Sequence, residues 1–362
     1  MRLNPLAYKH LDRWVGRWLF PEEPQERPDP DRPVTVHLSV CDHYEPEAEG
    51  ADPQTALARV DRWVTEYPRL FGEFEDFEGR PPQHTCFFPQ DQYRPEYLDR
   101  LKELVVAGFA DVDVHLHHDG DTPESLTEKL AGFRDDLWNR HGLLRRDADG
   151  RVVYGFIHGN WALCNSRDDG RWCGVDRELS VLMDTGCYAD FTMPSAPSTT
   201  QTPTINSVYH AKDADGPRGH FRGVRSRAGV APPEGHLLMV QGPLCLDWGS
   251  RKFGVLPRTE NADVHTNLPP TLHRFRNWLK AGVHVAGEPN EVFVKLHTHG
   301  CKPGNIDRWF SDSLVRFHED LREFVRRSDG RLRLRYVTAW QTAETIRDIE
   351  SRAVEPAGGV TR

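Results

Sequence analysis

The sequence predicts an α/β protein with parallel strands, arranged as a distorted (β/α) barrel. Short segments rich in Val and Leu alternate with amphipathic segments of helical period across residues 34–352, a pattern typical of parallel sheets. Polar, histidine-rich residues follow several strand segments, which is where barrel enzymes place their chemistry. No glycine-rich phosphate loop follows the first strand segment, which disfavours a dinucleotide-binding sheet. An open doubly wound sheet shares the alternation, so it is the strand-end motifs that favour the barrel.

The expected elements follow in order from the hydrophobic periods. Strands are predicted at residues 34–40, 84–88, 112–117, 152–157, 237–241, 291–296 and 333–337, with a short element at 188–191. Helices are predicted at residues 52–71, 95–107, 122–138, 176–185, 272–281, 305–327 and 343–352. Residues 192–235 are rich in Pro, Gly, Ser and Thr and lack a strong period. They predict a long irregular insertion over the barrel mouth, with room for a hairpin.

The two ends of the chain differ from its middle. Residues 1–20 predict an amphipathic helix with Arg13 and Arg17 beside an apolar stripe, which consists of Leu11, Trp14, Val15, Trp18 and Leu19. Such a helix either docks on the domain or rests on a membrane surface. Residues 21–33, rich in Pro, Glu and Asp, predict an extended linker. Residues 353–362 predict a disordered tail, which leaves residues 34–352 for the barrel domain.

Composition limits the partners and the compartment. Of the 362 residues, 46 are Lys or Arg and 55 are Asp or Glu, which gives a net charge of −9 and disfavours a nucleic-acid partner. No apolar run is long enough for a transmembrane segment, and residues 1–20 lack the apolar core of a signal peptide. We therefore expect a cytoplasmic protein, with peripheral contact to the inner membrane through residues 1–20 as an alternative.

The cysteines do not indicate a covalent or metal-bound framework. There are seven of them and no Cys-x-x-Cys pair. An odd number in a large cytoplasmic chain does not predict disulfides, and the spacing does not indicate a zinc knuckle. We therefore expect most of the cysteines to be small buried hydrophobic residues.

The first candidate site lies at the end of the strand at 112–117. Alternation along a strand puts Asp113, His115 and His117 on one face, and two imidazoles spaced by two residues commonly hold one metal ion. The alternative is a polar lining without metal. Asp42 ends the first strand and is expected at the same mouth as a metal ligand or catalytic carboxylate, and Asp121 is a further candidate ligand. Alternatively, Asp42 caps a turn and Asp121 caps a helix.

His297 and His299 form the second candidate pair. They share one face at the end of the strand at 291–296. We expect them to be catalytic: either could ligate metal, and one could act as general acid, because an imidazole titrates near neutral pH. Asp and His ligands suit zinc, and also manganese, cobalt or nickel. Such a divalent metal would activate water for hydrolysis.

A third candidate segment, for substrate binding, follows the strand at 152–157. It consists of His158, Gly159, Asn160 and Trp161. Asn160 could donate a hydrogen bond to an oxyanion, and the Trp161 indole could stack on a sugar ring. A plain turn is the alternative interpretation. No Gly-x-Ser-x-Gly elbow is present, so a serine hydrolase is not indicated.

The order of these motifs resembles that of the polysaccharide deacetylase family, whose fold is a distorted (β/α) barrel. The similar segments lie at residues 40–44, 85–88, 113–117, 158–160, 186–191 and 294–297. The resemblance implies that Asp42 is a metal ligand or the catalytic base, that a histidine of the 113–117 segment binds metal, and that His297 is the general acid. Asp121 stands where the family has its second metal histidine, and His158 where it has an arginine.

The implied activity is a metal-dependent removal of acyl groups, such as acetyl, from a carbohydrate substrate in cell-envelope or exopolysaccharide metabolism. Two alternatives remain open. One is a barrel hydrolase acting on another C–N bond or a glycosidic bond, and the other is a catalytically inactive barrel that binds glycans. Bound metal would separate the inactive protein from both enzymes, and acetate release would separate the two enzymes from each other.

Overall fold

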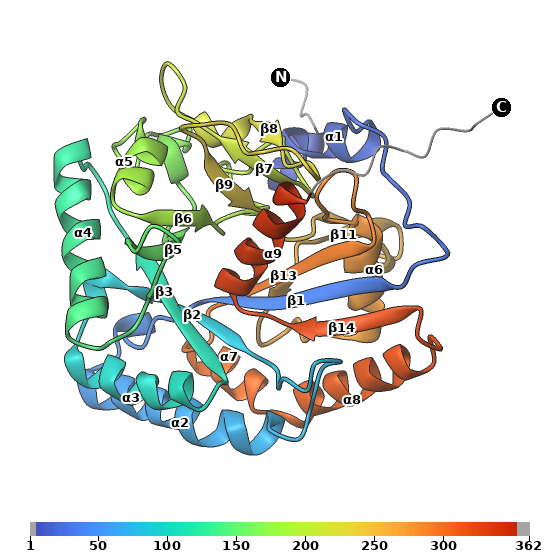
Figure 1. The fold of residues 1–362 in the computed structure, drawn as a ribbon, viewed down its shortest axis with the longest axis horizontal. Helices are drawn as coiled ribbons and strands as arrows, with labels where there is room; N and C mark the ends of the chain where they lie inside the picture. Colours follow the sequence, from blue (N-terminus) through green and yellow to red (C-terminus); the bar gives the residue numbers. More distant parts are fainter. Residues whose placement is uncertain (1–4, 353–362) are drawn as a thin grey trace.

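A row of parallel strands forms the centre of the molecule in the computed structural model, which describes residues 5–352 (Figure 1). Hydrogen-bonded neighbours follow the order β12-β13-β1-β2-β3-β5-β6-β9 with all pairs parallel, and β7 and β8 add antiparallel strands beyond β9. The strands of the parallel row are β12 (Asp263–Val264), β13 (Glu291–Thr298), β1 (Val34–His43), β2 (His84–Pro89), β3 (Ala110–Leu116), β5 (Val152–His158), β6 (Cys187–Asp190) and β9 (Leu237–Val240).

The remaining strands attach to this row or stand apart from it. β14 (Leu332–Tyr336) pairs in parallel with the first half of β1, and β2 pairs with its end. The short or antiparallel strands are β4 (Arg145–Arg146), β7 (Val208–Ala211), β8 (Val224–Arg225), β10 (Cys245–Lys252) and β11 (Leu256–Glu260). The parallel α/β architecture expected from the sequence is confirmed. The strand pairings within residues 5–352 leave β12 and β8 as two ends of the row, so closure into a barrel stays a prediction.

Helices follow the strands at or near the expected positions. They are α1 (Val15–Leu19), α2 (Pro53–Phe71), α3 (Pro95–Val106), α4 (Pro123–Asn139), α5 (Glu178–Asp184), α6 (Leu272–Ala281), α7 (Pro303–Trp309), α8 (Asp312–Arg326) and α9 (Ala339–Ser351). Local chemistry sets several starts. The Asp52 carboxylate accepts the backbone N–H groups of residues 54 and 55 at the start of α2, and Thr122 and Thr338 form capping boxes before α4 and α9.

Alternation along the strands divides the core into two layers. Even-numbered residues of β1, such as Val36 and Leu38, are buried in one cluster with side chains of α2, α3, α4 and α8. Odd-numbered residues of the neighbouring strands, such as Phe87 and Phe293, are buried in another cluster with α9. We call the face toward α9 the inner face. A residue's parity in β1 therefore decides whether its side chain meets the inner or the outer layer.

The expected helix at 305–327 is two helices. α7 ends at Trp309. The indole Nε1 of Trp309 donates a hydrogen bond to Thr298 Oγ1 of β13 at 3.0 Å. Ser311 Oγ then donates to the Arg308 carbonyl at 2.7 Å, and α8 begins at Asp312. A buried aromatic anchor thus ends the first helix, although the apolar period continues across the break.

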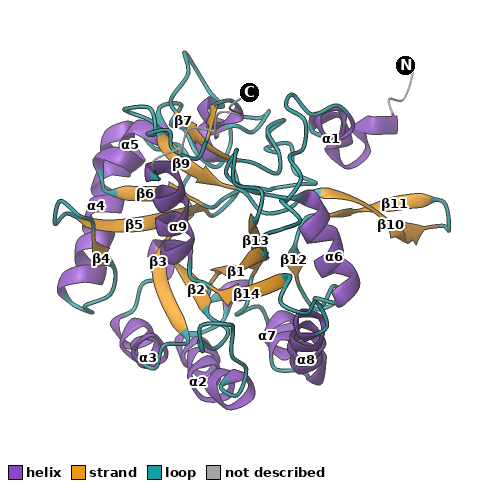
Figure 2. Ribbon diagram, turned by 45° about the vertical axis from the view of Figure 1, so that its right-hand side comes forward, coloured by secondary structure: helices purple, strands orange, loops and turns teal. Residues whose placement is uncertain are grey.

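The β10–β11 hairpin has no counterpart in the elements expected from the sequence. It projects from the body beside α6 (Figure 2). Its turn carries Phe253, which is 91 % exposed, and Trp248 is also exposed. Because few of these side chains are buried, the segment lacks the alternating hydrophobic pattern on which strand prediction depends.

The N-terminal segment docks on the body. Residues 1–4 lie outside the described residues, and the expected single helix appears as a 3-10 turn at Pro5–Arg13 followed by α1. Trp14 is fully buried, in one cluster with Ala196 and Leu244. Leu19 and Phe20 are exposed. Contact with a membrane surface through residues 1–20 stays a prediction.

The Pro-rich segment at 21–33 is extended as expected, and it is tied to the body. Gln25 Nε2 donates to the Lys280 carbonyl at 2.9 Å, and the backbone N–H of Asp29 donates to Asn290 Oδ1 at 2.8 Å. No helix among the described residues is both long and apolar enough to cross a membrane. The expected tail at 353–362 lies outside the described residues.

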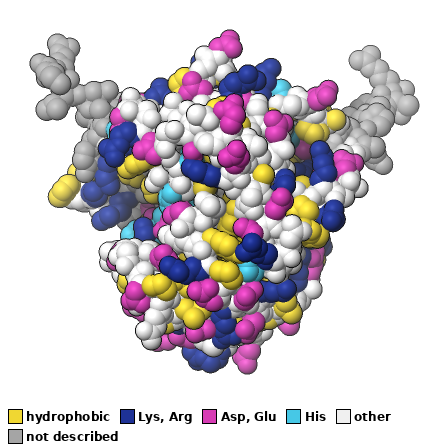
Figure 3. All heavy atoms as spheres, turned by 90° about the vertical axis from the view of Figure 1, so that its left-hand side faces the viewer, with side chains coloured by type: hydrophobic (Ala, Val, Ile, Leu, Met, Phe, Trp, Pro, Cys, Tyr) yellow, Lys and Arg dark blue, Asp and Glu magenta, His cyan; other side chains and the backbone are white. Residues whose placement is uncertain are grey.

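The irregular region at 192–235 contains the expected hairpin, formed by β7 and β8. β7 also pairs with β9, so this region extends the sheet at its edge. On the face of the molecule drawn in Figure 3, basic and acidic side chains are interspersed rather than gathered by sign.

Candidate metal centre

Three strands of the parallel row, β13, β1 and β3, deliver histidines to one place on the inner face. β1 ends at His43, with Glu45 two residues later. β3 supplies His115, with His117 directly beyond its end, and β13 leads to His299. In register, Cys41 of β1 lies beside His297 of β13, so these strand ends lie close together. We call His43, Glu45, His115, His117 and His299 the open cluster.

Glu45 is the centre of the open cluster. Its Oε1 atom lies 3.3 Å from His115 Nε2 and 3.2 Å from His117 Nε2. Its Oε2 atom lies 3.2 Å from His299 Nδ1. Two sets of three residues each bring one ligand atom per residue to within 4.8 Å of the others. The first set is Glu45, His115 and His117, and the second is His43, Glu45 and His299. Each carboxylate oxygen therefore belongs to a three-residue set of the kind that holds a divalent cation.

The β3 histidines are oriented by contacts on their far nitrogens. His115 Nδ1 donates to the Ile157 carbonyl at 3.0 Å, and His117 Nδ1 lies 3.0 Å from Asp91 Oδ1. Both contacts direct Nε2 toward Glu45, as second-shell carbonyls and carboxylates do for metal-ligating histidines. Gly159 permits this packing, because a Cβ at that position would overlap the His117 ring.

His43 and Trp161 complete the inner wall of the open cluster. The His43 ring lies 4.7 Å from the His115 ring and 4.5 Å from the His299 ring, centre to centre. The Trp161 ring lies 5.9 Å from His43 and 6.0 Å from His299. His43 Nδ1 and Trp161 Nε1 are buried without a hydrogen-bond partner. Buried polar atoms are rarely left unpaired, so these two atoms indicate room for a ligand.

The charges in the open cluster suit cation binding. Burial would raise the pKa of Glu45, but hydrogen bonds from His115, His117 and His299 hold that pKa well below its ordinary value. Burial lowers the pKa of both His43 and His115. Burial also lowers the pKa of His117, but Asp91 and Glu45 outweigh that effect and raise it to about 9. An ionised carboxylate thus lies among imidazoles of which two are kept neutral, the form that binds metals.

Asp42, expected in this site, lies on the opposite face of β1. It is fully buried, with Oδ1 accepting the Gly300 backbone N–H at 2.7 Å and Oδ2 lying 2.9 Å from His84 Nε2. It belongs to none of the ligand groups found within residues 5–352. The expectation that Asp42 joins the histidines therefore needs correction, because residues 42 and 43 point to opposite sides of the strand.

Asp121 and His158 are also placed elsewhere. Asp121 accepts Lys129 Nζ at 2.8 Å and Ser125 Oγ at 2.7 Å near the start of α4, which agrees with the alternative of a helix-end role. His158, expected to bind substrate, is fully buried beside His118 on the outer side of the strands. Neither residue belongs to the open cluster. His158 belongs to a second group of side chains around His118, and Asp121 contacts that group through His118.

The remaining expected residues divide between the site and its margin. His299 belongs to the open cluster, and Trp161 lies beside it. Asn160 is half-buried, and its backbone N–H donates to His158 Nδ1. His297 shares the inner face with His299, but it is 7 % exposed, its Nδ1 lacks a partner, and burial lowers its pKa to about 4. His297 is therefore neutral near pH 7, unlike the imidazolium expected of a general acid.

The site residues that the sequence expectations omit are His43, Glu45 and Asp91. The signal for two of them is present in the sequence. The two-residue alternation, continued beyond Cys41, puts His43 and Glu45 on the inner face with His115. Asp91 has no such signal, because it lies in the 3-10 turn after β2 and reaches His117 only through the fold.

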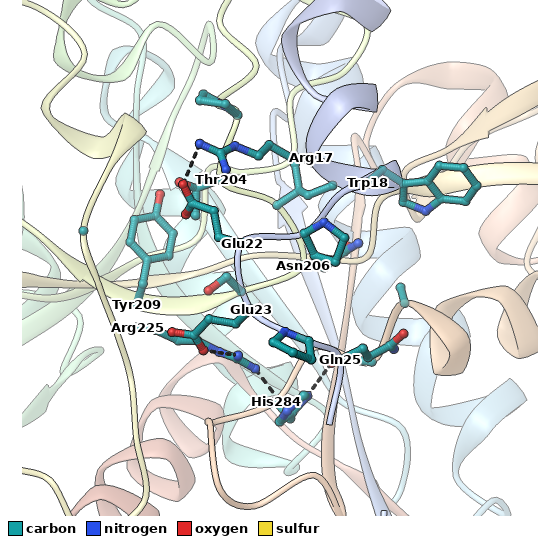
Figure 4. A pocket seen from close by; sticks show the side chains of 18 of the residues that line it. Arg17, Trp18, Glu22, Glu23, Gln25, Thr204, Asn206, Tyr209, Arg225 and His284 are labelled. Carbon is teal, nitrogen blue, oxygen red and sulfur yellow. Dashed lines mark hydrogen bonds and ion pairs between the residues drawn. The ribbon is translucent and has the colours of Figure 1, made fainter. Parts of the chain in front are cut away.

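A separate pocket of about 640 Å³ lies beneath the N-terminal segment (Figure 4). Arg17, Glu22, Glu23 and Gln25 line one side, with the ion pair between Arg225 and Glu23 at 2.7 Å across it. No residue of the open cluster lines this pocket. It is the space under the docked linker and not part of the candidate metal centre.

Comparison with known proteins adds little to this geometry. No family model matches the chain, and no curated protein does. Among solved structures, 4-alpha-glucanotransferase from Thermococcus litoralis aligns with a TM-score of 0.45 and 11 % sequence identity. The alignment covers 86 % of this chain and spans 40 % of that chain. A likeness at this level identifies neither fold nor activity, so the function is argued from this chain's own residues.

Proposed function

We propose that this protein is a metal-dependent hydrolase whose centre is the open cluster. The observation that carries the proposal is the Glu45 carboxylate, which lies 3.2–3.3 Å from three imidazole nitrogens at the ends of parallel strands. Carboxyl ends of parallel strands are where α/β enzymes place their active sites. His117 and His299 have 26 % and 17 % of their side chains exposed, so the centre is accessible from solvent, as a catalytic metal site must be.

The residues present fit a divalent cation, with zinc first and manganese, cobalt or nickel as alternatives. Glu45 Oε1 and the Nε2 atoms of His115 and His117 would hold it, because the far nitrogens of both histidines are engaged by Ile157 and Asp91. When bound, the cation supplies a Lewis acid for hydrolysis. The other half of the cluster, His43 and His299, lies on the Oε2 side and remains free to exchange protons with substrate.

We assign proton transfer to His299 in preference to His297. His299 contacts Glu45 and Trp161 and is partly exposed. His297 is buried, and no contact with the Glu45 carboxylate is among its interactions within residues 5–352. A group that gives a proton to a leaving amine or alcohol must reach that atom. The sequence pattern puts both histidines on one face, and the resemblance favours His297 as the general acid. The greater exposure of His299 and its contact with Glu45 support His299 instead.

The substrate class that we favour is an acylated carbohydrate, from which the enzyme removes acyl groups such as acetyl. Support comes from the resemblance of the strand-end motifs to polysaccharide deacetylases and from Trp161, an indole at the margin of the centre that could stack on a sugar ring. Hydrolysis of another C–N bond or of a glycosidic bond uses the same cation and remains the alternative. An inactive glycan-binding protein is the second alternative, and stoichiometric divalent metal in the purified protein would disfavour it.

Three variants and two substrates test this proposal. Glu45→Gln and His117→Ala should each lower acetate release from an acetylated glycan by roughly 10²- to 10⁴-fold, because each removes a cation ligand. Asp91→Asn should have a smaller effect, about 10- to 100-fold in metal affinity, since it acts through His117. An aryl glycoside serves as the competing substrate.

Cleavage of the aryl glycoside without acetate release would show that the protein is a glycosidase and not a deacylase. Full activity of both the Glu45 and His117 variants would remove the open cluster as the active centre. Asp147→Asn provides a matched control, because Asp147 is a half-buried carboxylate outside both clusters that accepts from Arg151 and from the backbone N–H of Asp149 in its own turn.

A further inference from the structure

A second group of ligand-type side chains lies on the other side of the same strand ends. His118 follows His117 directly, and the two side chains enter different clusters. His118 is joined by His158 at the end of β5, Cys173 in the loop that follows, and Glu178 at the start of α5. We call these four residues the closed cluster. All are buried, and three have no exposed surface at all.

The four side chains converge on one point. His118 Nε2 lies 3.2 Å from Glu178 Oε1, Cys173 Sγ lies 3.3 Å from Glu178 Oε2, and His158 Nε2 lies 3.9 Å from Glu178 Oε1. One ligand atom from each residue lies within 4.8 Å of all the others. Zinc bonds of about 2.0–2.3 Å put tetrahedral ligand atoms roughly 3.3–3.8 Å apart, so small movements would suffice to coordinate one ion.

Surrounding groups orient the closed cluster as they would the ligands of a metal. Asp121 Oδ2 lies 3.2 Å from His118 Nδ1, which directs His118 Nε2 inward. The backbone N–H groups of Asn165 and Val175 both donate to Cys173 Sγ, at 3.3 Å and 3.4 Å. Burial and the Glu178 carboxylate raise the pKa of the free thiol, whereas a bound cation together with these two donors would stabilise the thiolate that binds metals.

The closed cluster also lacks a permanent positive charge. Within residues 5–352, the ion pairs of Glu178 are made with His118 and His158 and not with Lys or Arg. His158 Nε2 is buried without a hydrogen-bond partner and is directed toward Glu178. A buried carboxylate beside a cysteine and an unpartnered imidazole is costly unless a cation joins them.

The loop that carries Cys173 has a strained backbone that a bound cation would stabilise. Four of its residues other than glycine have positive φ angles, at 56° for Trp161, 51° for Cys164, 50° for Asn165 and 68° for Trp172. Each such conformation costs free energy and persists only when the surroundings fix it. A cation held between the loop and the ends of β3 and β5 would supply that constraint.

We propose that the closed cluster is a structural zinc site formed by His118, His158, Cys173 and Glu178. Thiolate, imidazole and carboxylate ligands in a closed four-residue set suit zinc. The site lies apart from the active centre and stabilises the loop that positions Trp161. Ligation by His158 Nε2 leaves the ring proton on Nδ1, so the 3.2 Å contact from the Asn160 N–H must open when zinc binds.

The test uses the full chain, purified without chelators, and zinc and cobalt as probes. Wild-type protein should contain one zinc at the closed cluster in addition to the metal of the open cluster. The double variant Glu45→Gln/His117→Ala should retain the zinc of the closed cluster. Cys173→Ser should lose the zinc of the closed cluster and keep the metal of the open cluster. Cys187→Ser, a buried cysteine outside both clusters, should lose none.

Cobalt exchanged into the wild-type chain gives a readout that needs no variant and no activity. We expect a sulfur-to-cobalt charge-transfer absorption, which Cys173→Ser abolishes and the Glu45→Gln/His117→Ala variant retains. If the folded wild-type protein binds cobalt without this absorption, the proposed zinc site is wrong. The closed cluster is then a buried ion pair between His118 and Glu178. Loss of metal from the open-cluster variant alone leaves the structural site standing, so the two proposals fail separately.

Discussion

Asp42 is a buried carboxylate with both oxygens engaged, one by the Gly300 N–H and one by His84. A Cβ at Gly300 would overlap Asp42 Oδ2, so the strand end of β13 is fitted to this side chain. Its position explains why a carboxylate is needed at residue 42 without any contact to a metal. Asp42 joins the end of β1 to the start of β2 and to Gly300, just beyond β13, on the outer side of the sheet.

We expect Asp42→Ala to lower the free energy of unfolding by roughly 2–5 kcal/mol, because two buried donors lose their acceptor. Urea unfolding measures this, and metal content should stay unchanged in the folded protein. Asp135→Ala, at an exposed carboxylate of α4, should change stability by less than about 0.5 kcal/mol. Loss of metal from a folded Asp42→Ala protein would make Asp42 a ligand after all.

At this scale, the sequence predicts the residues whose position follows from strand alternation. His115, His117 and His299 were expected at strand ends and lie together, as does Trp161. Glu45 could have been found by continuing the alternation past β1. Cys173 could not, because its loop has no period, and the role of Glu178 at the start of α5 could not, because the cluster exists only after β3, β5 and α5 have packed. Ligand spacing along the chain carries no signal when each ligand comes from a different element.

At the scale of elements, buried amphipathic helices and hydrophobic strands were predictable, since their periods are long and their caps are local. α6 (Leu272–Ala281) agrees with the sequence expectation in both bounds. The break between α7 and α8 depends on Trp309 reaching Thr298 in β13, a contact with no local signal. The β10–β11 hairpin is exposed on both sides at its tip, so its residues carry no burial pattern.

The N-terminal segment offers a test of docking. Trp14 is fully buried, whereas Phe20 is 78 % exposed. Trp14→Ala should release residues 5–33 from the body and make the 21–33 linker sensitive to limited proteolysis, because large-to-small changes at buried sites cost roughly 3–5 kcal/mol. Phe20→Ala should leave the digestion pattern unchanged. Equal cleavage of both variants and the wild type would mean that other contacts, such as those of Gln25 and Asp29, hold the segment alone.

At the scale of the whole molecule, stability should depend on pH through histidines that are buried in neutral form. His318 lies on the buried face of α8, against Tyr336 of β14. It is surrounded by Phe71, Phe74 and Phe317, and burial lowers its pKa to about 3. Burial likewise lowers the pKa of His220 to about 3. In the unfolded chain each titrates near its ordinary value, about 6.5.

Between about pH 6.5 and pH 3 the unfolded chain therefore binds more protons than the folded protein, and stability falls as the pH falls. Each group contributes a slope of up to about 1.4 kcal/mol per pH unit. Urea unfolding between pH 6.5 and pH 4.5 should show this decline. His318→Phe should flatten it, at the cost of the hydrogen bond to Tyr336. An unchanged slope in that variant would mean that His318 is protonated in the folded protein.

The adjacency of His117 and His118 has a consequence for how the protein is made. The proposed cation ligands of the open cluster, Glu45, His115 and His117, all precede His118 in the chain. The closed cluster is complete only at Glu178, and His299 follows still later. Because nascent domains acquire structure from the N-terminal side, the ribosome supplies the ligands of both ions before it reaches the histidine assigned to proton transfer, so ion uptake would precede completion of the catalytic centre.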